Sequence, residues 1–253
     1  MSGLCIVFLN RCEKLFRVLG RVNVTKVAVI QSNYIPWKGY FDIIHDVDQF
    51  VFYDDVQFTK NDWRNRNKIK TAHGLTWLTI PVGNRLDRLI CEVELVDNGW
   101  RRKHWAAIQQ SYSKAPYFKM YRGFFEFVYQ EAEWVNLSDL NQFLIGSISR
   151  EFLGIQTEFK DSRDFHPQGK NLDRLIDLLK KTGASLYVSG PSARAYIDTN
   201  VFGNAGIEVV YKNYSGYPEY QQSYPPFEHG VSIIDLLFNC GPAAPDFIWG
   251  WRS

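Results

Sequence analysis

Short apolar runs rich in β-branched residues alternate along the chain with amphipathic stretches. A continuous run of this kind predicts a buried strand, and apolar residues that recur every three or four positions predict a helix. The strands expected on this basis are 26–30, 49–53, 76–82, 91–96, 157–160, 186–188 and 208–211. The helices expected between them are 39–47, 171–181, a short one that ends at Tyr196, and 232–239.

The middle of the chain, residues 100–152, has helical spacing throughout. Pro116 interrupts this spacing, and a third helix is expected to start near Asn136 with Ser138 as its N-cap. Strands that alternate with helices favour an α/β fold with a mainly parallel sheet and flanking helices, and the middle adds a helical cap subdomain. We expect residues 1–25 to be an N-terminal extension and residues 26–253 to form a single α/β domain with a helical insert around 100–152.

Composition narrows the possible functions. The chain has 253 residues, a net charge of +2 and 22% charged residues, the balance of a globular protein and not of a strongly basic nucleic-acid binder. No apolar run is long enough for a membrane helix, so stable membrane insertion is not expected. The four cysteines are scattered without a C-x-x-C pair, which argues against a metal site and indicates a cytoplasmic protein. Aromatic residues reach 16%, which suits a site that stacks a base or a sugar.

Two turn-rich segments follow expected strands, at the sheet edge where parallel α/β proteins bind their ligands. The first segment offers Gln31, Asn33, Tyr34, Trp37 and Gly39 as candidate substrate-binding residues. The second, after strand 186–188, offers Ser189 and Gly190, small residues ahead of a helix whose backbone N–H groups can approach a phosphate. Neither segment matches a P-loop or a G-x-G-x-x-G motif, and an ordinary turn is the alternative for each.

Asp54 and Asp55 end the strand 49–53 and are candidate catalytic residues, since paired acids can bind a ribose or accept a proton. The alternative is that one acid caps the following turn and the other is solvated. Adjacent strand residues point to opposite faces. We therefore expect Asp55 to face the cleft together with Val51 and Tyr53, and Asp54 to lie on the other side.

Further candidates lie after these acids. The stretch Trp63-Arg-Asn65-Arg66-Asn interleaves two arginines with two amides, a pattern suited to binding a phosphate or a carboxylate. Trp63, Asn65 and Arg66 are therefore candidate substrate-binding residues, with a solvated loop as the alternative. His104 is a candidate general base, and a structural histidine is its alternative. No G-x-S-x-G motif supports a hydrolase.

The segment AVIQSNYIPWKGYFDIIHDVDQFVFYDDVQFTKNDWRNRNKI, residues 28–69, resembles the WbqC-like family. Further similarity lies in WLTIPV at 77–82, in residues 187–191 and in SIIDLLFNCG at 232–241. The similarity extends from Lys26 to Gly241, and it departs from the family pattern at Ser32, where proline is common. The first segment is also distantly similar to nucleotidyltransferases and class I synthetases, although the sequence lacks their His-x-Gly-His motif.

The resemblance implies a role in the biosynthesis of bacterial surface polysaccharides such as O-antigens. The activity it implies is a transferase or ligase that adds an amino acid such as glycine to the amine of a nucleotide-linked amino sugar. The implied partners are that sugar nucleotide and an amino-acid or acyl donor, with aminoacyl-tRNA as the one nucleic acid that the resemblance allows. The use of ATP stays open, and the alternatives are a non-catalytic binding protein for a sugar nucleotide or glycan and a nucleotidyltransferase-like enzyme.

Overall fold

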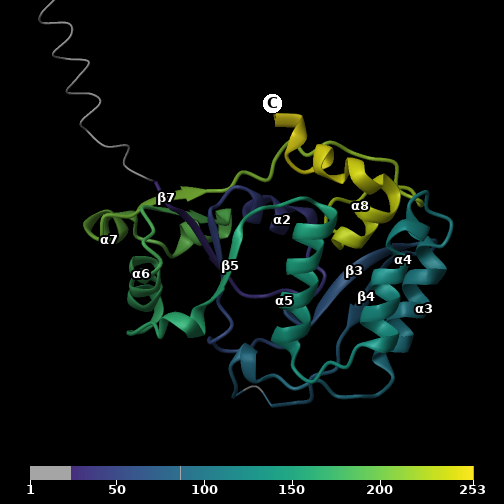
Figure 1. The fold of residues 1–253 in the computed structure, drawn as a ribbon, viewed down its shortest axis with the longest axis horizontal. Coiled ribbons are helices and arrows are strands. Elements are labelled where there is room, and N and C mark those ends of the chain that lie inside the picture. The colour runs from purple at the N-terminus through teal and green to yellow at the C-terminus, as the bar shows by residue number, and fades with distance from the viewer. Residues whose placement is uncertain (1–23, 86, 253) are drawn as a thin grey trace, which may run out of the picture.

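A mainly parallel sheet flanked by helices forms the fold of the computed structural model, which describes residues 24–85 and 87–252. The α/β fold expected from the sequence is therefore confirmed (Figure 1). The sheet has five parallel strands in the spatial order β5-β2-β1-β6-β7. Their bounds are β1 Lys26–Ile30, β2 Gln49–Phe52, β5 Glu158–Asp161, β6 Leu186–Ser189 and β7 Glu208–Tyr211.

Strand alternation divides the sheet residues between two hydrophobic clusters. On β1, Val27 and Val29 belong to one cluster and Ala28 to the other. The cluster of the two valines is covered by α6 (Asn171–Lys181) and α7 (Thr199–Asn204). The opposite face is covered by α2 (Lys38–His45), whose Phe41 and Ile44 are fully buried.

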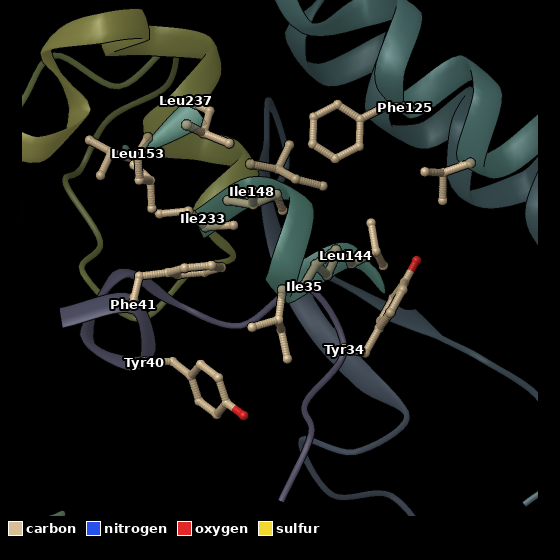
Figure 2. Packing of buried hydrophobic residues seen from close by; sticks show 14 of the residues in the cluster. Tyr34, Ile35, Tyr40, Phe41, Phe125, Leu144, Ile148, Leu153, Ile233 and Leu237 are labelled. Carbon is tan, nitrogen blue, oxygen red and sulfur yellow. The ribbon is translucent and has the colours of Figure 1, made fainter. Parts of the chain in front are cut away.

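The helical middle packs into the same cluster as α2. It consists of α3 (Trp100–Tyr112), α4 (Phe118–Glu126) and α5 (Leu137–Ser147), with π-helical turns at Phe127–Glu131 and Ile148–Phe152. Figure 2 shows Phe125, Leu144 and Ile148 of this part beside Phe41 of α2 and Ile233 and Leu237 of α8 (Ile233–Cys240). The helical middle therefore shares its core with one face of the sheet.

The structure corrects three expectations. Residues 66–71, where no strand was expected, form β3 (Arg66–Thr71), which pairs antiparallel with β4 (Gly74–Thr79) in a separate two-stranded sheet. Residues 91–96 form no strand, and a short 3-10 helix, Ile90–Glu92, stands at their start. The N-cap of α5 is Asn136 instead of Ser138, because the Asn136 side chain accepts the hydrogen bond from the Ser138 backbone N–H.

The strand order has its switch point between β1 and β6. In chain order the five strands run 3-2-1-4-5 across the sheet. The chain thus builds outward from β1 through β2 to β5 on one side, and from β6 to β7 on the other. Ligands of doubly wound sheets bind at such a switch point, outside the carboxyl ends of the strands. The segments that begin at Gln31 and at Gly190 follow directly on these two strand ends.

Candidate functional site

The loop from Gln31 to Trp37 is held by hydrogen bonds from two other parts of the chain. The Asn67 amide of β3 donates to the carbonyls of Tyr34 (3.1 Å) and Ile35 (2.9 Å). The backbone N–H of Ile233 donates to the carbonyl of Pro36. These bonds fix Ile35 at φ 36°, a left-handed conformation that is strained for a β-branched residue.

A pocket of about 290 Å³ lies where these three segments meet. Two tryptophans, Trp37 and Trp63, stand in its wall, and the Trp63 ring is 44% exposed. Pocket residues come from the loop after β1, from the start of the hairpin and from the turn before α8. They are Asn33, Pro36, Trp37, Trp63, Asn67 and Gly230.

Gly39 is required by the position of the Trp37 ring. A Cβ atom at residue 39 would lie 2.2 Å from Cζ2 of Trp37. The other side of the ring meets Tyr214 and Tyr217 edge-on, at centroid distances of 5.1 and 6.0 Å. Trp37 is therefore fixed between α2 and the 214–217 segment. Gly39 contributes to the site because its missing side chain makes room for the Trp37 ring.

Positive charge gathers beside the pocket. Arg64 donates to Oδ1 of Asn33 at 3.3 Å and lies 3.5 Å from Asp62. The Arg66 guanidinium stacks on Trp77 at 4.3 Å from the ring centroid. Residues 60–70, KNDWRNRNKIK, contain five basic residues and one acid, a net charge of +4. This segment is suited to an anionic ligand.

Asp54 lies in the interior. Its side chain is fully buried and accepts hydrogen bonds from the backbone N–H of Ser32 (2.8 Å), from the Ser138 hydroxyl and from the Gln142 amide (3.1 Å). The carboxylate thus connects the loop after β1 to α5. None of these hydrogen-bond partners lines the pocket, so the geometry gives Asp54 a structural role.

Asp55 points to the opposite side of the sheet from Asp54. It forms an ion pair with Arg174 of α6 and accepts a hydrogen bond from Ser162. Val51 and Tyr53 lie in the cluster on this α6 side. The division of the two acids between the faces therefore follows strand alternation, but the Asp55 side lies away from the pocket of Trp37 and Trp63.

His104 is enclosed in a hydrogen-bonded chain with two tyrosines. The Tyr34 hydroxyl lies 2.9 Å from His104 Nδ1 and 2.6 Å from the Tyr129 hydroxyl. Burial lowers the pKa of His104 to about 4, although a hydrogen bond with the Thr79 backbone opposes this. Burial also raises the pKa of the Tyr34 and Tyr129 hydroxyls. All three groups are neutral at pH 7, and they brace the loop instead of opening into the pocket.

The remaining candidates fall into two groups. Asn65 is buried and its amide donates to the Ile80 carbonyl, so its side chain is not available to a ligand. Gln31 and Gly190 are half-buried at the ends of β1 and β6. The buried Ser189 hydroxyl lies 3.3 Å from that of Tyr187. These three residues line the switch point, not the pocket of Trp37 and Trp63.

The predicted candidates therefore do not form one cluster. The structure brings together Asn33, Trp37 and Trp63, and it separates them from both acids and from His104. Sequence reasoning missed Asn67, Pro36 and Gly230. The sequence could have indicated Asn67, because this residue belongs to the repeated Arg-Asn pattern after Trp63. Gly230 stands in a turn whose sequence shows no such pattern.

The part of the chain that the structure describes contains neither a metal-binding cluster nor a membrane-spanning helix. Within residues 24–85 and 87–252, no group of three or more His, Cys, Asp or Glu side chains could hold a metal ion. In the same ranges no helix has the length and apolarity needed to span a membrane. Cys91 and Cys240 are free thiols, whereas Cys5 and Cys12, with nearly all of the expected extension 1–25, lie outside the described residues.

Comparison with known proteins supports the resemblance seen in the sequence. The model of the WbqC-like protein family matches residues 31–247. The "Uncharacterized protein Rv1507c" of Mycobacterium tuberculosis (strain ATCC 25618 / H37Rv) is 45% identical over 225 residues, which cover 88% of this chain and 97% of that protein. No solved structure matches the chain, so the distant similarity to nucleotidyltransferases stays a prediction. The match to the family model extends over most of the chain, which therefore belongs to the WbqC-like protein family.

Proposed function

We propose that this protein is a cytoplasmic transferase or ligase of bacterial surface-polysaccharide (O-antigen) biosynthesis. It would attach an amino acid such as glycine to the amine of a nucleotide-linked amino sugar. The observation that supports this best is the pocket between Trp37 and Trp63, beside a segment with a net charge of +4. Family membership supports the pathway.

The composition of the pocket matches a sugar linked to phosphate. Its volume of about 290 Å³ suits one sugar ring with a substituent, and aromatic walls bind the apolar face of such a ring. Asn33 offers an amide to ring hydroxyls and is oriented by Arg64. An arginine at this position can at the same time bind a phosphate oxygen through its remaining N–H groups.

The proposed reaction forms an amide bond. The sugar ammonium group first loses one proton to give the free amine. The amine attacks the carbonyl carbon of an activated amino acid, the leaving group departs with the bonding electron pair, and the nitrogen loses its second proton. A base assists that proton loss. The three predicted acid–base residues, Asp54, Asp55 and His104, all lie away from the pocket. The proton is therefore proposed to pass to water, while Asp54 and His104 hold the loop and Asp55 holds α6 through Arg174.

A second candidate function is non-catalytic binding of a sugar nucleotide or glycan in the same pathway. The observation that favours it is the use of Asp54 and His104 in buried hydrogen bonds, away from the pocket. The pocket residues themselves are amides, a proline, a glycine and two tryptophans, which bind but do not exchange protons at neutral pH.

One experiment separates these functions. The protein is incubated with ATP, glycine and a panel of dTDP- and UDP-linked amino sugars, and the products are read by mass spectrometry. A sugar nucleotide heavier by one glycyl residue supports the proposed enzyme. Unchanged sugars with measurable binding support the binding protein, and pyrophosphate without an amide supports a nucleotidyltransferase-like enzyme. Trp63→Leu should reduce glycyl transfer, and Trp251→Leu, an equally drastic change at a Trp outside the pocket, should not.

A further inference from the structure

The outer face of the β3–β4 hairpin carries exposed rings and positive charge next to the pocket. We name this surface the hairpin platform, made of Trp63, Arg66, Lys68, Leu75 and Trp77. Trp63, Leu75 and Trp77 are 44%, 42% and 43% exposed. Apolar groups of this size are normally buried, so three of them together mark a binding surface.

The register of the hairpin explains how the platform arises. Lys68 lies opposite Trp77, and Arg66 lies opposite Thr79, so these side chains share one face. The alternate residues Asn67, Ile69 and Leu78 are buried on the inner face. The sequence RNKI thus places Arg66 and Lys68 outside and Asn67 and Ile69 inside, whereas the next cation, Lys70, is buried and donates to Gln222.

The platform cations have no carboxylate to neutralise them. The acid of this segment, Asp62, lies near Arg64 and accepts hydrogen bonds from Thr59 and from the Trp63 backbone. Among the described residues no acid pairs with Arg66 or Lys68, and the Arg66 Nε atom is buried without a hydrogen-bond partner. Both cations instead lie over Trp77, at 4.3 and 5.6 Å from its ring centroid.

The platform is continuous with the pocket through Trp63. That ring lines the pocket and lies 5.6 Å from the Trp77 ring, tilted by 38°. A ligand that leaves the pocket over Trp63 therefore meets Trp77 together with the Arg66 guanidinium that lies over it. An extended ligand in this direction would have one ring in the pocket, an anionic group at the guanidinium and a second ring on the platform.

We propose that the hairpin platform binds the nucleoside diphosphate half of the substrate, with the base stacked on Trp77 and the phosphates held by Arg66 and Lys68. This rests on the proposed function and adds where the nucleotide lies. Two cations match a diphosphate, and one pair of rings matches a single base and a single sugar. A polynucleotide would need a longer row of rings and charges than the hairpin provides.

The test uses free UDP and dTDP, without any sugar, in calorimetric titrations of the full chain. Trp77→Leu should weaken UDP binding by about 5- to 150-fold, the usual contribution of one aromatic–base stack. The same variant should leave the binding of inorganic pyrophosphate unchanged, since that probe has no base. Arg66→Ala/Lys68→Ala should weaken both probes by at least about 10-fold. Trp251→Leu and Lys103→Ala/Lys119→Ala, exposed residues away from the hairpin, serve as matched controls.

The outcomes separate the platform from the proposed function. Undiminished UDP affinity in Trp77→Leu, with the melting temperature of the wild type, overturns the platform, even where glycyl transfer is observed. UDP binding that depends on Trp77 and Arg66 supports the platform, even where no amino acid is transferred. A single-stranded RNA oligomer that binds at least 100-fold more tightly than UDP overturns the assignment to a mononucleotide.

Discussion

Replacing Asp54 by asparagine should destabilise the fold while the pocket keeps its residues. The carboxylate has no solvent exposure and serves three donors. One oxygen accepts from the Ser32 backbone, and the other accepts from Ser138 and Gln142. In Asp54→Asn only one side-chain oxygen remains as an acceptor. The new NH₂ group is itself a donor, and it faces the Ser138 hydroxyl and the Gln142 amide, which both donate to the carboxylate in the wild type.

The cost follows from the bonds that are lost. The Ser32 bond can persist to the asparagine oxygen, and the Ser138 hydroxyl can rotate to accept, but the Gln142 amide then faces another donor. A hydrogen bond to a charged group contributes about 1.5–3 kcal/mol. Losing the equivalent of one to two such bonds lowers the free energy of unfolding by about 2–4 kcal/mol. In a protein of this size this lowers the melting temperature by roughly 5–15 °C.

Differential scanning calorimetry and urea unfolding measure this directly. Asp164→Asn, which changes an exposed aspartate, is the matched control and should melt with the wild type. Glycyl transfer by Asp54→Asn, measured well below its melting temperature, should stay within a few-fold of the wild type. A variant with unchanged stability and no activity would refute the reasoning and place Asp54 among the catalytic residues.

Three further predictions concern other parts of the site. The pKa of His104 falls from 6.5 to about 4 on folding, so the free energy of unfolding should decrease by up to about 3 kcal/mol as the pH drops from 6.5 to 4. Urea unfolding should show a shallower decrease for His104→Gln, and a pH dependence identical to that of the wild type would contradict this. Gly39→Ala forces the Trp37 ring aside, so calorimetry should show weaker sugar-nucleotide binding and a free energy of unfolding lower by about 1–3 kcal/mol. Binding with the wild-type affinity would mean that the pocket does not need this ring position. Asp55→Asn should lower the free energy of unfolding by about 1–3 kcal/mol in urea unfolding, because it removes the ion pair with Arg174, and kcat should stay within a few-fold of the wild type. A loss of kcat of about 10²-fold or more with an unchanged circular dichroism spectrum would contradict this and make Asp55 the proton acceptor.

The sequence predicted the main sheet well because its central strands β1, β2 and β6 are mostly buried. Runs such as KVAVI contain enough β-branched residues to be recognised without an alternating pattern, and α6 was expected at its observed bounds from its amphipathic spacing. The hairpin strand β3 was missed because its inward residue Asn67 is polar. Its burial is made possible by carbonyls of a loop more than thirty residues away, which no local pattern reveals.

The candidate site was harder to predict than the fold. Residue types suggested His104 and Asp54 as reactive groups, but their reactivity depends on burial and partners that the chain acquires only on folding. Asn33, Trp37 and Trp63 were found because turns with aromatic and amide residues are typical of ligand sites at strand ends. Gly230 joins them only because the segment before α8 pairs with Trp37 and β3.

A crystal structure of the protein with a dTDP- or UDP-linked amino sugar tests the central claim most directly. The account predicts density for the sugar between Trp37 and Trp63, with the phosphates at Arg66 and the base on Trp77. A sugar nucleotide bound instead in the larger cavity of about 780 Å³ beside Lys26, Lys212 and Trp251, with the Trp37 pocket empty, would contradict it.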